Sequence, residues 1–247
     1  MVANSAGLLI PINDYEKEKN KLKNDPGAVQ RIKVIEKKEV IINRISLFRS
    51  QVASVAAELD CEGERADQLS AYLDKIDRTQ TKNLTVASIV SGAIGGVVSA
   101  LLSGNDSKAA AITGGFSSAV LGLISLSSTR KINLSHPRNL LRDVWFSPKH
   151  SKDYPVMVWN MLTHPMFSNS QQFSVAYYMR KRWEDFEGLK PAKKKMDKKI
   201  KLLLSDGGAY TAGELKLRAN MINQLQATVK LIDQDIQGLL SEIADEK

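Results

Sequence analysis

Three histidines and one cysteine are the side chains of this sequence best suited to binding a metal or attacking a substrate. His136, His150 and His164 each stand beside Pro or Lys, and no two of them have the i, i+4 spacing that puts two ligands on one helix face. Cys61 is the only cysteine, so neither an intrachain disulfide nor a cysteine metal cluster can form. The sequence therefore predicts no metal site and no cofactor.

Motifs of the common enzyme classes are also missing from the sequence. There is no nucleophile elbow, no phosphate-binding loop and no dinucleotide fingerprint. The pair Gly207-Gly208 lacks the strand and helix that flank a phosphate loop. Acidic residues alternate with basic ones on the predicted helix faces, as they do on solvated helices. We expect a protein that is not an enzyme and has no catalytic residues.

Basic residues give the 247-residue chain a net charge of +8, and much of the excess lies in residues 129–190, which hold 10 basic and 5 acidic residues. The candidates for contact with lipid headgroups are Lys82, Arg130, Lys131, Lys193, Lys194 and Lys195. Clustered bases are attracted to anionic lipid by about 1 kcal/mol each, although the lysine run is equally typical of a solvated helix face. We expect an anionic bilayer as a partner, and no nucleic acid, because no stacking platform accompanies these bases.

The strongest functional signal is the apolar segment from Thr85 to Ser128, whose 44 residues include two charges, Asp106 and Lys108. Two arms of about 20 residues flank a polar turn, and each could cross a bilayer core of about 30 Å. Small residues recur along both arms: Ser88, Gly92, Gly96, Ala100, Gly104, Ala110, Gly114, Ser118 and Gly122. Such stripes let two helix backbones approach closely. We predict a helical hairpin with three possible settings. It spans a membrane, it is folded inside a soluble bundle and emerges on insertion, or it stays buried in a soluble core.

Two long helices are predicted on either side of the hairpin. Residues 28–84 contain no proline and place apolar residues at alternating spacings of three and four: Val34, Ile41, Ile45, Phe48, Val52, Val55, Leu59, Ala66, Leu69, Leu73 and Ile76. Glu62 interrupts this stripe, and the adjacent Gly63 could break the helix. Residues 211–244 repeat the pattern at Leu215, Ile222, Leu225, Val229, Ile232, Ile236, Leu239 and Ile243, interrupted at Arg218. We expect the two stripes to pair antiparallel, and the first helix to run into the hairpin without a break.

The remaining segments complete an all-α prediction, an elongated helical bundle or coiled coil carrying a glycine-striped hairpin. Residues 1–27 are predicted to be irregular, with a short helix between Tyr15 and Lys23. Residues 129–190 form an aromatic-rich connecting region, in which Val156–Leu162 is a short helix or strand and Ser170–Phe186 a helix. Residues 191–247 hold a basic helix and then the C-terminal helix. The aromatic residues are interpreted either as a packed core or as an interfacial belt.

This layout is similar in outline to α-helical pore-forming toxins of the haemolysin E class, in which an elongated bundle carries an apolar element. The resemblance implies that Gly92, Gly96, Gly114 and Gly122 line helix contacts in an inserted state. We expect a membrane-associated, non-enzymatic protein that forms a homo-oligomer or binds a coiled-coil partner. Two alternatives remain: a resident membrane or envelope scaffold anchored by the hairpin, and a soluble coiled-coil interaction protein. The N-terminus lacks the features of a secretory signal.

Overall fold

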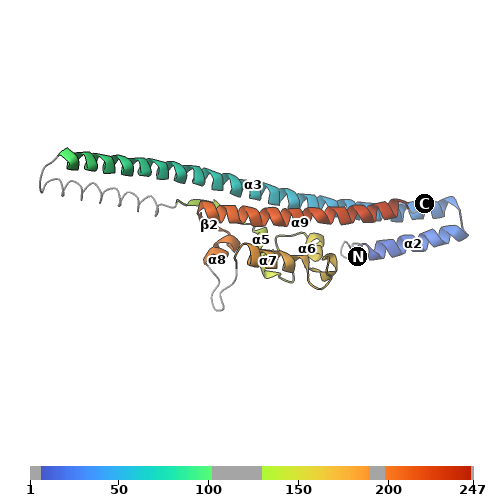
Figure 1. The fold of residues 1–247 in the computed structure, drawn as a ribbon. Helices are drawn as coiled ribbons and strands as arrows, with labels where there is room; N and C mark the ends of the chain where they lie inside the picture. Colours follow the sequence, from blue (N-terminus) through green and yellow to red (C-terminus); the bar gives the residue numbers. More distant parts are fainter. Residues whose placement is uncertain (1–6, 102–129, 190–197, 246–247) are drawn as a thin grey trace. The chain divides into compact units, whose positions relative to one another are not determined.

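The computed structural model describes residues 7–101, 130–189 and 198–245 (Figure 1). In chain order its elements are α2 (Leu9–Asn24), α3 (Ala28–Leu101), β1 (Ile132–Ser135), α5 (Leu140–Phe146), α6 (Val156–Thr163), the 3-10 turn η1 (Pro165–Phe167), α7 (Val175–Phe186), α8 (Lys198–Leu204), β2 (Gly207–Tyr210) and α9 (Ala212–Asp245). The all-α prediction is confirmed. One pair of short strands, β1 and β2, forms a two-stranded sheet that the sequence did not indicate.

The chain divides into two compact units. The first unit comprises residues 1–65, 135–207 and 217–247, and the second comprises residues 66–134 and 208–216. Helices α3 and α9 each contribute residues to both units.

Helix α3 continues without interruption past Gly63, so of the two possibilities left open by the sequence the unbroken helix is the one that forms. The glycine instead permits a close approach of α9. A Cβ atom at position 63 would lie 2.5 Å from Oδ1 of Asn223 and 3.2 Å from Cγ2 of Ile222. The other prediction for this helix is confirmed, because α3 runs on into the first apolar arm and is described as far as Leu101.

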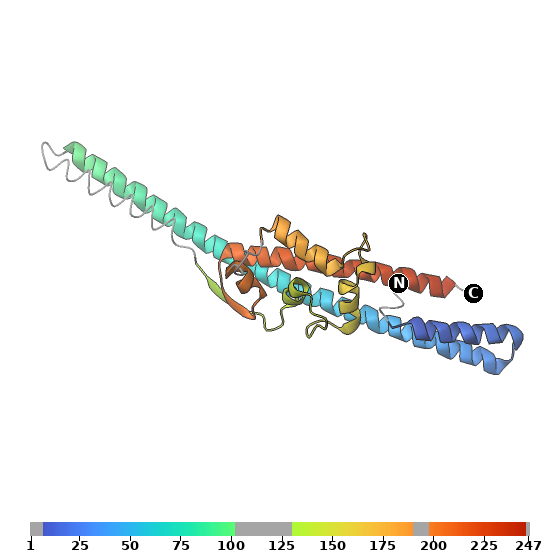
Figure 2. The ribbon, with the colours of Figure 1, turned by 90° about the horizontal axis from the view of Figure 1, so that it is seen from below.

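In the first unit, α9 lies beside α3 in the antiparallel direction, as predicted (Figures 1 and 2). Arg49 Nε binds Asp233 Oδ1 at 3.0 Å, and Gln226 Nε2 donates to Asp60 Oδ1 at 2.5 Å. The predicted stripe residues that are buried in this unit are Ile41, Ile45, Phe48, Val52, Val55 and Leu59 on α3, and Ile222, Leu225, Val229, Ile232 and Ile236 on α9. These side chains form the apolar core between the two helices.

The predicted short helix between Tyr15 and Lys23 is confirmed but is longer than expected, because α2 begins at Leu9, in a stretch that was predicted to be irregular. Pro11 is the third residue of this helix, where the main-chain nitrogen needs no partner within the helix. Helix α2 lies against the start of α3 (Figure 2), where Gln30 Nε2 donates to the Glu18 side chain at 2.7 Å. Arg44 Nη1 donates to the carbonyl of Gly7 at 2.7 Å.

The connecting region of the first unit consists of short helices, among which α5 packs on α7 and α8, and α6 packs on α7. Val156–Leu162 was predicted to be a short helix or a strand, and it forms the helix α6. The predicted helix over 170–186 begins later, at Val175, because the Ser174 side chain caps it by accepting from the N–H of Tyr177 at 3.2 Å. The aromatic residues divide: Trp145, Tyr154, Trp159 and Trp183 are buried, whereas Phe146, Phe173, Tyr177, Tyr178 and Phe186 are exposed.

The second unit brings the start of α9 against α3. Ser70 Oγ donates to the carbonyl of Ala212 at 2.9 Å, and Lys216 Nζ binds Asp67 Oδ1 at 2.8 Å. The first turn of α9 has a capping box, in which the Thr211 N–H donates to Glu214 Oε2 at 2.8 Å and the Glu214 N–H donates to Thr211 Oγ1 at 3.3 Å. These bonds satisfy main-chain donors at the start of the helix.

Candidate functional site

The predicted small-residue stripes are only partly described by the structure. Ser88, Gly92, Gly96 and Ala100 lie within α3. Gly104, Ala110, Gly114, Ser118 and Gly122 lie outside the described residues. Packing between the two arms of the hairpin therefore stays a prediction.

Of the predicted headgroup contacts, Lys82, Arg130 and Lys131 are exposed residues of the second unit. Lys193, Lys194 and Lys195 lie outside the described residues. Among the helices in residues 7–101, 130–189 and 198–245, none has the length and apolar content that a bilayer crossing needs.

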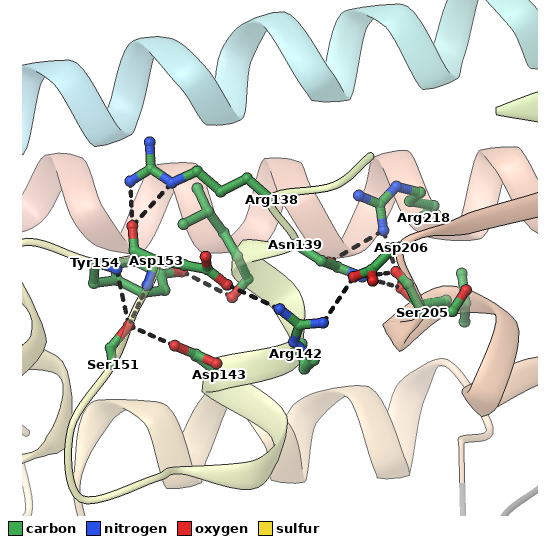
Figure 3. A network of polar contacts seen from close by, with 12 residues as sticks. Arg138, Asn139, Arg142, Asp143, Ser151, Asp153, Tyr154, Ser205, Asp206 and Arg218 are labelled. Carbon is green, nitrogen blue, oxygen red and sulfur yellow. Dashed lines mark hydrogen bonds and ion pairs between the residues drawn. The ribbon is translucent and has the colours of Figure 1, made fainter. Parts of the chain in front are cut away.

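Within the first unit, the structure gathers a cluster of polar side chains around the start of α5 (Figure 3). We call it the arginine cluster: Arg138, Asn139, Arg142 and Arg218 with their acidic partners Glu58, Glu62, Asp153 and Asp206. Its members come from α3, α5, α9, the loop before α6 and the segment after α8. The cluster therefore fastens the connecting region to the two long helices.

Arg138 joins α3 to the loop before α6. Its Nη1 lies 2.6 Å from Oε2 of Glu58, its Nε donates to the carbonyl of Asp153 at 3.0 Å, and its Nη2 donates to the same carbonyl. Burial raises the pKa of the Glu58 carboxyl, and the positive charge of Arg138 opposes that rise. The ion pair thus offsets part of the cost of burying the charged form of the Glu58 carboxyl group.

Arg142 bridges two acidic residues from different segments (Figure 3). Its Nη1 donates to Oδ1 of Asp206 at 2.8 Å, and its Nη2 donates to Oδ2 of Asp153 at 3.3 Å. A planar guanidinium with several fixed donors suits this role, because it can bind two carboxylates at once. The bridge ties the loop before α6 to the residues that follow α8.

The C-terminal end of α8 is capped by two buried side chains. Asn139 Nδ2 donates to the carbonyls of Leu203 at 2.9 Å and Ser205 at 2.7 Å. Arg218 Nη1 donates to the same Leu203 carbonyl at 3.0 Å and lies 3.4 Å from Asn139 Oδ1. The last carbonyls of a helix have no partner within it, so these bonds supply partners where water is absent.

A second group of bonds shapes the loop between α5 and α6. Ser151 Oγ donates to Oδ2 of Asp143 and accepts from the N–H groups of Asp153 at 3.0 Å and Tyr154 at 2.8 Å. The buried hydroxyl of Tyr154 donates to the carbonyl of Leu140 at 3.0 Å, and burial raises its pKa well above the ordinary value. Tyr154 therefore stays neutral and serves as a hydrogen-bond donor.

His136 lies at the edge of the cluster with 2% of its surface exposed. Its main-chain N–H donates to the carbonyl of Asp206 at 2.9 Å. Burial, followed by the charge of Arg218, lowers the pKa of His136 to about 4. The imidazole is thus neutral at pH 7.

The cluster is suited to holding chain segments together. Its arginines direct their donors to carboxylates and carbonyls of the same unit, and the neighbouring hydroxyls of Ser151 and Tyr154 bind carboxylate and main-chain groups. Among the described residues, no group of three or more His, Cys, Asp or Glu side chains could hold a metal ion. Sequence reasoning missed the cluster, although Glu62 and Arg218 marked part of it by interrupting two apolar stripes.

Comparison with known proteins yields no relative: no protein-family model, no curated protein and no solved structure matches the chain.

Proposed function

We propose that this chain is a non-enzymatic α-helical protein that interacts with a bilayer by inserting its apolar segment 85–128, in the manner of a pore-forming toxin. The observation that carries the proposal is the continuity of α3 from Ala28 to Leu101. The same helix that supplies the apolar core of the first unit leads directly into the first apolar arm. The first arm is thus a direct continuation of a helix of the folded chain, which is an arrangement that suits presentation of the arm to a membrane.

Charge and composition further support the proposal. Lys82, Arg130 and Lys131 flank the hairpin and are exposed, as contact with anionic headgroups requires. The small residues of the two arms favour close pairing of the helices, which lowers the cost of inserting arms rich in Ser, Gly and Ala. The arginine cluster fits a supporting role, since it fixes the connecting region of the first unit without presenting a reactive group.

The test is binding to, and leakage of, dye-loaded vesicles of phosphatidylcholine with and without phosphatidylglycerol. Ile94→Arg places a charge in the middle of the first arm, at a cost of about 3 kcal/mol in a bilayer core, so leakage at a fixed protein concentration is expected to fall by roughly a hundredfold. Tyr72→Arg is the matched control, because Tyr72 is 57% exposed on α3. Failure of the unaltered chain to bind or permeabilise vesicles of any composition would refute the proposal.

Two further measurements separate the alternatives. A chain that fractionates with membranes and resists a carbonate wash is a resident scaffold. In a soluble protein with a packed hairpin, replacing Gly92 and Gly96 by Leu should lower the free energy of unfolding by a few kcal/mol, about the cost of overpacking. In arms that face lipid, the same replacement should be nearly silent.

A further inference from the structure

Helix α3 carries a second stripe of residues at spacings of three and four, separate from the stripe that faces the core. We call it the outer stripe: Ile32, Ile35, Glu39, Ile42, Ser46, Arg49, Ala53, Ala57 and Asp60. Because these spacings keep residues along one side of a helix, the outer stripe forms a continuous surface of the first unit. All of its members are exposed except Arg49, which is half-buried.

The N-terminal half of the outer stripe contains three exposed isoleucines. Ile32, Ile35 and Ile42 are 56%, 57% and 40% exposed, although α2 already lies against the start of α3. Single exposed aliphatic residues are common on proteins. Three isoleucines along one side of a helix, with Glu39 between Ile35 and Ile42, make an apolar ridge with one charge in it, which is typical of a surface that another molecule covers.

The C-terminal half of the outer stripe lines a groove. This groove of about 670 Å³ lies along α3 and α9, and its uncharged lining on α3 is mostly small: Ser46, Ser50, Ala53, Ala56 and Ala57, together with Val52. Charged groups also line it: Arg49, Asp60, Lys230 and Asp233. The groove therefore combines room for large apolar side chains with fixed charges of both signs.

We propose that the ridge of one chain fills the groove of a second copy, with the two α3 helices antiparallel and a two-fold axis at Arg44. Positions equally distant from Arg44 then face each other. Ile35 meets Ala53 of the other copy, Ile42 meets Ser46, and Ile32 meets Ala56 beside Ala57. Each large side chain is matched to a small one, which is the complementarity that close helix packing needs.

Charge complementarity selects this arrangement over a parallel one. In the antiparallel register, Glu39 faces Arg49 of the other copy, which also binds Asp233 of its own chain at 3.0 Å and lies next to Lys230 in the groove lining. A parallel pair would set Glu39 against Glu39 and Arg49 against Arg49, would stack isoleucine on isoleucine, and would leave the groove unfilled. Like charges placed together in an interface are strongly unfavourable. The contact uses residues 32–60 and does not depend on the apolar hairpin.

Disulfide trapping tests the register. In a Cys61→Ser background, Ile35→Cys and Ala53→Cys are made as separate chains and oxidised alone or as an equimolar mixture. The expected result is a disulfide between the two different chains in the mixture, with little product from either chain alone, because identical positions lie far apart in an antiparallel pair. Disulfides formed within each single variant would indicate parallel pairing and would overturn the proposal.

Sedimentation equilibrium provides a second readout that does not depend on oxidation. The unaltered chain is expected to show a monomer–dimer equilibrium. Glu39→Arg should weaken dimerisation by about tenfold or more, since it sets a second positive charge against Arg49 of the other copy. The additional change Arg49→Gln removes the opposing positive charge without setting a carboxylate against Asp233, and it should restore part of the loss. Asp74→Arg is the control, because Asp74 is an exposed residue of the second unit and lies outside residues 32–60. A chain that remains monomeric at all concentrations up to about 100 times those used for trapping would overturn the proposal.

Discussion

Arg218 of α9 and Glu62 of α3 face each other, with Nη2 and Oε2 4.0 Å apart. Each is the one charged residue that interrupts an otherwise apolar stripe. Arg218 is 2% exposed, and it also binds the end of α8 through the carbonyl of Leu203. A shift of α9 along α3 by one turn would separate the two charges and remove this anionic partner from the buried guanidinium, so the pair favours a single register of the two helices.

Removing the buried guanidinium should destabilise the protein strongly. Arg218→Ala leaves the Glu62 carboxylate without this cationic partner and removes one of the two donors to the Leu203 carbonyl, so we expect the free energy of unfolding to fall by about 2–4 kcal/mol. The measurement is urea denaturation followed by circular dichroism. The double change Arg218→Met with Glu62→Gln removes both charges and should cost less. A loss below about 1 kcal/mol for Arg218→Ala would contradict the assigned role.

Gly63 should be intolerant of even one added carbon atom. Gly63→Ala pushes a methyl group toward Asn223 and Ile222, and we expect a loss of about 1–2 kcal/mol from overpacking. Gly238→Ala in α9 is the matched control, because nothing lies within 4 Å of the added Cβ. That change should leave stability unchanged or raise it by about 0.5–1 kcal/mol through helix propensity. Equal effects of the two substitutions on the urea midpoint would rule out the close approach.

His136 should make the protein less stable in mild acid. Its pKa is lowered to about 4 in the folded chain, against 6.5 for an unperturbed histidine. As the pH falls from 6.5 to 4, the unfolded chain takes up a proton that the folded chain does not, so the free energy of unfolding falls by up to about 3 kcal/mol. Glu58, whose pKa is raised, acts in the opposite direction. His136→Asn should flatten the pH dependence of the thermal midpoint, and an unchanged slope would argue against this origin.

The cap of α9 should contribute measurably to stability. Thr211→Ala removes the hydroxyl that accepts from the Glu214 N–H and donates to its carboxylate, and we expect a loss of about 1 kcal/mol. Thr211→Ser retains the hydroxyl and should keep most of that stability. Thermal denaturation of the two variants provides the comparison. The cap would be unimportant if Ala and Ser gave the same midpoint.

Apolar periodicity predicted the two long helices and their pairing, because spacings of three and four fix which side of a helix meets its partner. Residues such as Ile45, Phe48 and Val229 are buried where that spacing placed them. Two kinds of local signal were ambiguous. Pro11 suggested irregular chain, yet proline is compatible with the first turn of a helix, and Gly63 suggested a break where it instead allows close packing.

The arginine cluster could not be predicted from the sequence, for a different reason. Arg142 and Asp206 are 64 positions apart, and Arg138 and Glu58 are 80 apart. Their pairing depends on where α5 and α8 lie, and helices of seven residues carry too little periodicity to be placed from sequence. Asn139 binds main-chain carbonyls, which every residue possesses, so no partner residue type could reveal that contact.

The continuity of α3 has a geometric consequence for the segment that follows it. An α-helix advances 1.5 Å and turns 100° with each residue, so the direction in which the backbone positions of Ser88, Gly92, Gly96 and Ala100 face is set by the number of residues that precede them in the same helix. Inserting a single residue after Lys82 would rotate that side of the helix by about 100° relative to Leu73, which is buried in the second unit. The number of helical residues between Leu73 and the first apolar arm therefore determines the direction in which the small residues of that arm face.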